Sequence, residues 1–121
     1  MFDAVRITEQ YLAVWNETDP AQRRRRLEEG WSDQALYVDP MVSASGREQI
    51  DQMIATVQAQ FPGFAFHLAG AVDAHHQQLR FGWELGPGAG PAPVAGFDVV
   101  VCDADGRIEQ VRGFLDRVPE G

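Results

Sequence analysis

The chain has 121 residues, of which 45% are hydrophobic and 10% aromatic, which suits one domain with one hydrophobic core. Its formal net charge of −8 argues against nucleic acid and against an anionic membrane surface as partners, because both bind a basic face. A small neutral or apolar ligand fits this composition better.

Two helices are expected near the start of the chain. Apolar residues recur at helical spacing over residues 2–16, which predicts an amphipathic helix. Asp19 and Pro20 have the pattern of an N-cap followed by proline at the first helical position, and Gly30 is placed to end the helix in a left-handed conformation. The second helix is therefore predicted over residues 20–29.

Four consecutive arginines, Arg23 to Arg26, lie in this second helix. Consecutive helical positions point in different directions around the helix axis, and Glu28 and Glu29 follow directly. We interpret the arginines as a solvated helix face rather than as an anion site, and assign them no function.

A short strand is expected at residues 35–39, where an apolar stretch ends in Asp39 and Pro40. Residues 45–48 have the sequence of a capping box, in which a serine and a glutamate cap the start of a helix. This third helix is predicted to extend to about residue 60. Its buried stripe is expected to consist of Ile50, Met53, Ile54 and Val57.

The rest of the sequence has the pattern of strands, predicted at residues 64–72, 78–85, 94–102 and 107–115, with hairpin turns at 73–76 and 103–106 and a Gly/Pro-rich connection at 86–93. Three helices and a series of antiparallel strands predict an α+β fold, with the helices packed on one face of a curved sheet. Such a sheet leaves a cone-shaped interior that can hold a small molecule.

Aromatic residues are available to line that interior. Phe81 and Trp83 alternate with polar residues and glycine, so their face of the strand is expected toward the core or the pocket. Core packing alone would also explain the aromatic residues. The full set of predicted binding residues is Trp15, Tyr37, His67, Phe81, Trp83 and Phe114.

The histidines are weak candidates for chemistry. His67 either enters the cavity as a second acid or base, or is an ordinary, partly buried histidine of the sheet. His75 and His76 lie in a predicted exposed turn, where neighbouring side chains are expected to point in opposite directions, so we predict no metal site.

The cellular setting is inferred from cysteine usage and hydropathy. The single cysteine, Cys102, cannot form an intramolecular disulfide, so the fold does not depend on an oxidising compartment. Residues 1–10 contain no apolar signal segment, and nothing approaches the roughly 18 apolar residues of a membrane span. We therefore expect a cytoplasmic protein that does not bind membranes.

The order of these elements, the strand end Tyr37-Val38-Asp39-Pro40 and the sequence of residues 105–116 resemble the NTF2-like superfamily, particularly its SnoaL-like and ketosteroid-isomerase-like branches. The resemblance covers residues 11–116 and implies one SnoaL-like domain over residues 1–121. It also implies a homodimer formed through the exposed face of the sheet. The superfamily includes isomerases, cyclases, dehydratases, epoxide hydrolases and non-catalytic binding proteins, so the resemblance is more specific for fold than for function.

Three residues match catalytic positions of the ketosteroid isomerases. Tyr11, five residues before Asn16, matches their oxyanion-binding tyrosine, and Asp39, before Pro40, matches their catalytic base. Asp98 matches a second, protonated aspartic acid that also binds the oxyanion. Enolisation next to a carbonyl requires these groups, a base near the acidic carbon and donors aimed at the oxygen. The resemblance thus implies an isomerase or a cyclase that acts on an enolisable carbonyl compound without a metal or an organic cofactor.

Each of these residues also has a purely structural explanation. Asp39 before proline is typical of an Asx turn at a strand end, and Tyr11 has the position of a core aromatic. Asp98 could face solvent, because the residues on either side of it form an apolar alternation of the opposite parity, namely Phe97, Val99 and Val101.

Other functions therefore remain open. One is a non-catalytic binding protein for a small hydrophobic molecule. Another is an interaction module that dimerises through its sheet, in which Trp15, Trp83 and Phe114 would fill the pocket. An epoxide hydrolase would need an aspartate–arginine–aspartate trio built on Arg80 with Asp98 or on Arg112 with Asp39, with the side chains facing inward.

Overall fold

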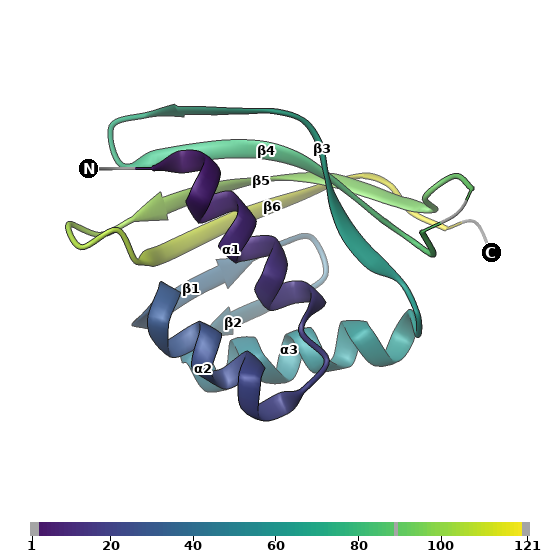
Figure 1. Ribbon diagram of the computed structural model, residues 1–121, viewed down its shortest axis with the longest axis horizontal. Helices are drawn as coiled ribbons and strands as arrows, with labels where there is room; N and C mark the ends of the chain where they lie inside the picture. The colour runs from purple at the N-terminus through teal and green to yellow at the C-terminus, as the bar shows by residue number, and fades with distance from the viewer. Residues whose placement is uncertain (1–2, 89, 120–121) are drawn as a thin grey trace.

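The structure is a computed structural model that describes residues 3–88 and 90–119 (Figure 1). In this part of the chain, the helices are α1 (Ala4–Asn16), α2 (Pro20–Gly30) and α3 (Gly46–Gln60). The strands are β1 (Trp31–Val38), β2 (Ser43–Ser45), β3 (Ala65–His75), β4 (Gln78–Gly86), β5 (Val94–Cys102) and β6 (Ile108–Arg117). The predicted α+β class is confirmed.

The strands form one sheet in the order β2-β1-β6-β5-β4-β3, in which only β1 and β6 run parallel. Figure 1 shows the sheet curving around the helices, with α1 crossing in front of it. Helix α1 packs on β3, α3 packs on β1 and β2, and α2 joins the two other helices. The curved, mostly antiparallel sheet is therefore as predicted, with β1 before α3 where a strand was expected and β2 as an additional strand.

Burial alternates along the strands. In β5 the buried positions are Val94, Gly96, Asp98, Val100 and Cys102, and the positions between them are only partly buried. Successive residues of a strand point to opposite faces of the sheet, so this series marks the inner face. The buried residues of α3 are Ile50, Met53 and Ile54, with Val57 partly buried, close to the predicted stripe. These inward faces form the core between sheet and helices.

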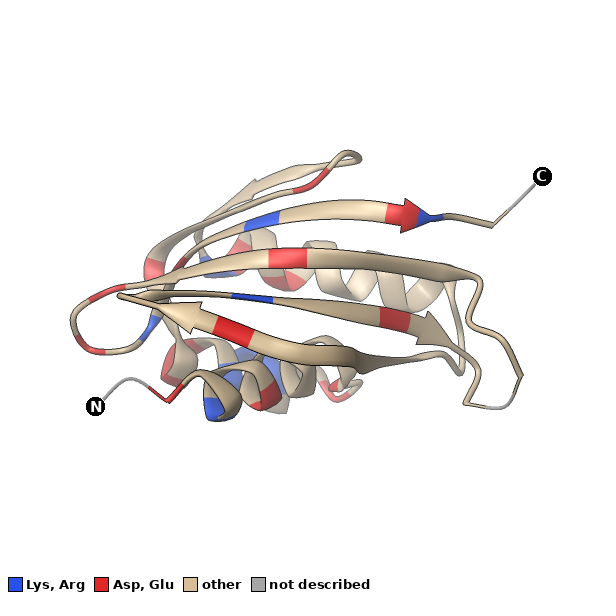
Figure 2. Cartoon of the chain, turned by 90° about the horizontal axis from the view of Figure 1, so that it is seen from above, with Lys and Arg blue, Asp and Glu red and all other residues tan. Residues whose placement is uncertain are grey.

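Charged residues are distributed over strands, turns and helices (Figure 2). The strands carry few of them along otherwise uncharged segments. In the described part of the chain, no helix has both the length and the apolar character needed to cross a membrane.

The passage from α2 to β1 differs from the prediction. Gly30 is the last residue of α2 and is not left-handed, and Trp31 caps the helix in an extended conformation. The indole of Trp31 is buried, so the chain enters the sheet directly at this residue. The strand consequently begins at residue 31 rather than 35.

The predicted capping box at residues 45–48 is also wrong. Ser45 makes no side-chain cap bond to α3, and its own N–H donates to Gln49 Oε1 at 2.9 Å. Ser45 is the last residue of β2, a three-residue strand that the sequence pattern did not predict. Its pairing with Leu36 of β1 orients the serine as part of the sheet rather than as a cap.

The four arginines were predicted to form a solvated helix face. Arg24 to Arg26 are exposed, as predicted, but the prediction is wrong for Arg23. The Arg23 side chain is only 4% exposed, and its Nε forms an ion pair with Asp51 Oδ1 at 2.6 Å. Its Nη1 donates to Glu17 O and to Gln58 Oε1. Arg23 therefore lies at the contact between α2 and α3, where its buried charge is paired with Asp51 and its Nη1 is hydrogen-bonded.

Candidate functional site

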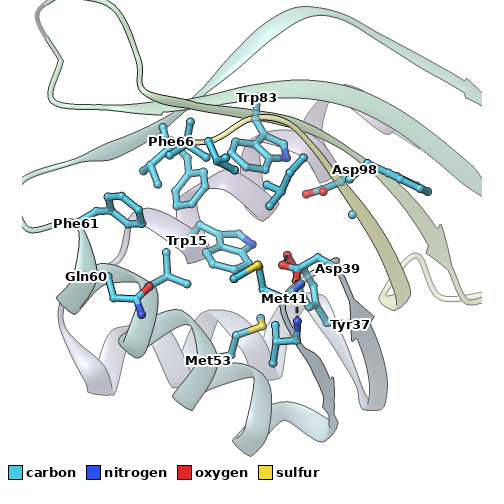
Figure 3. Close-up of a pocket in the computed structure, with 18 of the residues that line it drawn as sticks. Trp15, Tyr37, Asp39, Met41, Met53, Gln60, Phe61, Phe66, Trp83 and Asp98 are labelled. Carbon is cyan, nitrogen blue, oxygen red and sulfur yellow. Dashed lines mark hydrogen bonds between the residues drawn. The ribbon is translucent and has the colours of Figure 1, made fainter. Parts of the chain in front are cut away.

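A cavity of about 510 Å³ lies between the inner face of the sheet, α1 and α3 (Figure 3). This volume is within the usual range of small-molecule sites. Most of its walls are apolar or aromatic, and Asp39 and Asp98 are the charged side chains that line it. No described lysine, arginine or histidine is part of the lining. The cavity thus combines an apolar body with two carboxyl groups and no positive charge.

Asp98 faces this cavity from the inner side of β5 and is 2% exposed. Its Oδ2 accepts a hydrogen bond from Tyr11 Oη at 2.6 Å, across 87 residues of chain. Its Oδ1 is buried and has no hydrogen-bond partner among the described residues. The alternative in which Asp98 faces solvent is therefore wrong. The structure instead brings together two of the three residues that match catalytic positions.

Burial raises the pKa of Asp98 to about 6, because a charged carboxylate is poorly solvated at this depth. The hydrogen bond from Tyr11 offsets part of this rise in pKa by favouring the charged form, as does the nearby indole N–H of Trp83. Burial and the charge of Asp98 both raise the pKa of Tyr11. In the Tyr11–Asp98 pair, the Asp98 carboxyl therefore gains or loses its proton near pH 6, and the Tyr11 hydroxyl keeps its own.

Asp39 lies at the end of β1 and is held by three hydrogen bonds. Its Oδ1 accepts from the backbone N–H groups of Met41 and Val42 at 2.8 and 3.0 Å, and its Oδ2 accepts from Tyr37 Oη at 2.7 Å. The predicted Asx turn is thus present, and the same carboxylate also lines the cavity. Burial and the charges of Asp98 and Asp39 raise the pKa of Tyr37, so its hydroxyl keeps its proton. The structural and the functional readings of Asp39 are compatible.

Gly113 of β6 provides the space between these groups. It is the register partner of Asp98 across the β5–β6 pair. A Cβ at this position would lie 2.8 Å from Asp98 Oδ1, 3.2 Å from Asp39 Cβ and 3.5 Å from Tyr37 Oη. The Asp98 carboxyl group, the Asp39 side chain and the Tyr37 hydroxyl therefore surround the space that a side chain at residue 113 would occupy. The sequence analysis missed Gly113, although a glycine inside a strand pattern is a known sign of such a close approach.

Asn16 joins α1 to β3 at the opposite side of the cavity. Its side-chain amide donates to Phe66 O at 2.9 Å and accepts from Phe66 N at 2.7 Å. This pair of bonds holds the Phe66 ring against Trp15, with the ring centroids 5.1 Å apart. In the sequence Tyr11 to Asn16, the tyrosine thus serves the polar end of the cavity and the asparagine positions its aromatic wall.

Among the predicted binding residues, Trp15, Tyr37 and Trp83 line the cavity. Phe81 is on the correct face of β4 but belongs to the core, where it packs edge-on against the Tyr11 ring. Phe114 borders the cavity, but its ring is 49% exposed and stacks on Phe97 with centroids 4.8 Å apart. The outward direction of that ring follows from the inward position of Gly113 before it.

The expectation that His67 enters the cavity is wrong. His67 is exposed and pairs in register with Glu84. Its neighbour Phe66 lines the cavity, and adjacent strand residues point to opposite faces. No histidine is therefore available as a second acid or base in the described lining.

The structure does not bring together an aspartate–arginine–aspartate trio. Arg80 is exposed and pairs with Asp73 at 3.4 Å, and Arg112 is exposed and donates to Gln110. Neither lines the cavity. Both alternate with inward residues of their strands, so their side chains belong to the outer face.

The pair His75 and His76 is exposed, as expected, but the two rings meet. Their Nδ1 atoms lie 2.9 Å apart, because His76 has a positive φ of 57° that turns its side chain toward His75. The expectation that the two side chains diverge is wrong. Within residues 3–88 and 90–119, no group of three or more histidines, cysteines or acidic residues is arranged to hold a metal ion.

A curved six-stranded sheet with three helices packed against it is the architecture shared with NTF2-like proteins of known structure. Residues 8–111 match the SnoaL-like domain, and the chain belongs to that family. A comparison with curated proteins finds no match.

Solved structures agree with this membership. A presumed isomerase of the SnoaL-like family from Agrobacterium tumefaciens str. C58 is 40% identical, with a TM-score of 0.88 over 93% of this chain and 97% of that chain. Two structures under 25% identical share the fold. A presumed polyketide cyclase from Sinorhizobium meliloti is 13% identical, with a TM-score of 0.70 over 93% of this chain and 99% of that chain. A hypothetical protein with a ketosteroid isomerase-like fold from Catenulispora acidiphila DSM 44928, in complex with trimethylamine, is 18% identical, with a TM-score of 0.71 over 88% of this chain and 82% of that chain.

Proposed function

We propose that this protein is a cofactor-independent enzyme of the isomerase or cyclase type, which moves a proton on a small enolisable carbonyl compound. The observation that carries the proposal is Asp98, a buried carboxyl whose pKa is raised to about 6 and whose unpartnered Oδ1 faces an apolar cavity beside a second carboxylate. Two carboxyl groups in different environments can serve as an acid and a base at the same pH.

In this proposal Asp39 is the base. Its three hydrogen bonds hold the carboxylate at the cavity wall, and Oδ2 keeps a free lone pair after accepting the hydrogen bond from Tyr37. The carboxylate takes the proton from the carbon next to the carbonyl group, and the C–H bonding electrons move into the enolate. In a ketone with a β,γ double bond, return of the proton from Asp39 to the γ-carbon of the dienolate completes an isomerisation. In a compound with a second carbonyl group, the enolate carbon attacks that carbonyl, and the proton on Asp39 returns to the resulting alkoxide to complete a cyclisation.

Asp98 and Tyr11 act at the carbonyl oxygen. A ligand that fills the cavity displaces water, which further favours the neutral carboxyl, and the proton then lies on the free Oδ1. That proton donates to the oxygen on which negative charge accumulates. Tyr11 donates to Oδ2 and so acts through Asp98 in this arrangement, by orienting the carboxyl and making it a stronger donor.

The test is exchange of hydrogen for deuterium at the acidic carbon of a panel of cyclic ketones, followed by NMR in D₂O. Asp39→Asn is expected to lower the rate of protein-dependent exchange by about 100-fold or more, because an amide cannot serve as the base. Asp105→Asn, in the exposed turn before β6, is the matched control and is expected to retain the wild-type rate. Absence of protein-dependent exchange with every ketone would contradict the proposal.

The second candidate is a non-catalytic binding protein for a small hydrophobic molecule. It is favoured by the apolar walls and by exposed apolar residues that border the cavity, namely Met41, which is 81% exposed, and Val118. A protein that binds the ketones but does not exchange their protons would have this function. An interaction module with a filled pocket is not favoured, because Trp15 and Trp83 line an open cavity.

We also propose that the protein forms a homodimer through the outer face of the sheet. The stacked rings of Phe97 and Phe114 lie there, and Leu36 and Val38 of the neighbouring β1 are exposed. Phe114→Asp is expected to convert a dimer into a monomer in sedimentation equilibrium, because a charge at this position opposes burial of the face. Val5→Asp, on the exposed side of α1, is expected to leave the dimer intact. A monomeric wild-type protein would contradict this proposal.

A further inference from the structure

We propose that Met41, at the edge of the cavity, is a site of oxidation by hydrogen peroxide, and that its sulfoxide weakens the binding of apolar molecules in the cavity. The cavity thus loses affinity for an apolar ligand under oxidising conditions and regains it when the sulfoxide is reduced. This sensitivity concerns ligand binding alone and is independent of whether the protein turns its ligand over.

Met41 combines exposure to solvent with a place in the cavity lining. It is 81% exposed, whereas Met53, which also lines the cavity, is 8% exposed. A thioether must meet peroxide directly in order to react, so the rate of oxidation follows the accessibility of the sulfur atom. Met41 is therefore expected to be oxidised well before Met53.

The turn that carries Met41 is held by three hydrogen bonds. Asp39 N donates to Val42 O at 2.9 Å, and the N–H groups of Met41 and Val42 donate to Asp39 Oδ1 at 2.8 and 3.0 Å. Figure 3 shows the Met41 side chain extending from this turn toward Trp15. Oxidation of the sulfur does not change any of these backbone groups, so its effect is limited to the position and polarity of the side chain.

The Met41 thioether forms part of an apolar rim, which we define as Met41, Val42 and Val118. All three residues line the cavity and are exposed. A methionine side chain is flexible and polarisable, so it packs well against aromatic rings and ligands of irregular shape. The rim therefore covers an apolar ligand on its solvent side and removes part of its surface from water.

A sulfoxide at Met41 is polar and finds few hydrogen-bond donors in the cavity. The described lining contains no lysine, arginine or histidine, and Figure 3 shows Gln60 at the opposite edge of the pocket from Asp39. The hydroxyl groups of the lining already donate hydrogen bonds to other residues, namely those of Tyr11, Tyr37 and Thr56. The sulfoxide oxygen is therefore solvated best by water, so the oxidised side chain turns outward and uncovers the cavity.

Hydrogen peroxide is the only co-reactant that this oxidation requires. A lone pair of the sulfur attacks one peroxide oxygen, the O–O bond breaks, and the other oxygen leaves as water after proton transfer. The sulfur loses two electrons, which reduce the peroxide. Methionine sulfoxide reductases reverse the change, so the modification can serve as a switch.

The test measures oxidation and binding on the same samples. After treatment with hydrogen peroxide, peptide mass spectrometry is expected to show Met41 oxidised at least about tenfold faster than Met53. Naphthalene, which is neutral and has no reactive group, is the ligand probe, and its affinity is measured by NMR titration of the ¹⁵N-labelled indoles of Trp15 and Trp83. Oxidised protein is expected to bind naphthalene about tenfold more weakly, and treatment with methionine sulfoxide reductases is expected to restore the affinity.

Substitutions assign the effect to Met41. Met41→Leu keeps an apolar side chain of similar size and cannot be oxidised, so it is expected to bind naphthalene like wild type before and after peroxide treatment. Met53→Leu is the matched control in the same lining and is expected to lose affinity on treatment as wild type does. Met41→Gln is polar from the start and is expected to bind naphthalene about tenfold more weakly without peroxide.

The proposal is overturned if wild-type protein does not bind naphthalene, if Met41 is oxidised no faster than Met53, or if oxidation leaves the affinity unchanged. It is also overturned if Met41→Leu loses as much affinity on treatment as wild type, because the loss then comes from another residue. The indole N–H signal of Trp31, which is buried outside this cavity, is expected to stay unchanged and shows that each sample has remained folded.

Discussion

Asp98→Asn is expected to stabilise the protein at neutral pH. Burial raises the pKa of Asp98 from its ordinary value of 3.8 to about 6, so between these pH values the folded chain holds a proton that the unfolded chain has released. Stability therefore falls as the pH rises from about 4 to about 6, and a penalty of about 3 kcal/mol is complete above that range. An asparagine side chain is neutral over this whole pH range, so the variant does not lose this stability.

Urea denaturation at about pH 4 and about pH 7.5 measures this effect. The free energies of unfolding of Asp98→Asn and wild type are expected to be similar at the lower pH, and the variant is expected to exceed wild type by about 2 to 3 kcal/mol at the higher pH. Asp105→Asn, at an exposed position, is expected to show no such change with pH. The same difference at both pH values would show that Asp98 is not a buried, titrating group.

The same substitution is expected to reduce proton exchange by about 100-fold, since an amide is a much weaker acid and stabilises the developing oxyanion poorly. Asp98→Asn is thus expected to be more stable but less active than wild type, because the buried Asp98 carboxyl lowers stability while it serves the chemistry. Full activity in Asp98→Asn would remove Asp98 from the proposed mechanism.

Gly113→Ala is expected to block the polar end of the cavity. The added methyl group would lie 2.8 Å from Asp98 Oδ1 and 3.2 Å from Asp39 Cβ, closer than unbonded atoms normally approach. The backbone of Gly113 does not have a positive φ, so alanine introduces a steric change without backbone strain. We expect binding of the cyclic ketones, followed by NMR titration, to weaken more than about tenfold and their proton exchange to fall about 100-fold, because small displacements of catalytic groups have effects of this size.

The control for this variant is Gly30→Ala. A Cβ at Gly30 meets nothing within 4 Å, and its φ is not positive. This variant is expected to bind and react like wild type. If Gly113→Ala binds the ketones as tightly as wild type and unfolds at the same urea concentration, the ligand does not occupy the space between the two aspartates.

Much of the secondary structure could be predicted because its signals are local. Helical spacing of apolar residues located α1 and α3, and alternation located β4, β5 and β6 within about two residues. Predictions failed where distant residues decide the local conformation. Trp31 starts β1 early because its side chain is buried, and Arg23 is buried because Asp51 of α3 meets it. The residues that bury Trp31 and Arg23 are distant in the sequence, so the local pattern does not reveal either burial.

The sequence by itself indicated the α+β class and the SnoaL-like family, which the structure and the family match confirm, and it pointed to Tyr11, Asp39 and Asp98 as candidate site residues, because spacing and short motifs carry this information. Only the tertiary structure decided that Asp98 faces inward onto Tyr11, that Gly113 leaves room between the two aspartates, and that His67 points away. The physical reason is the register of the sheet. A shift of one residue between strands would reverse the face of every side chain, and that register is fixed by packing across the whole fold.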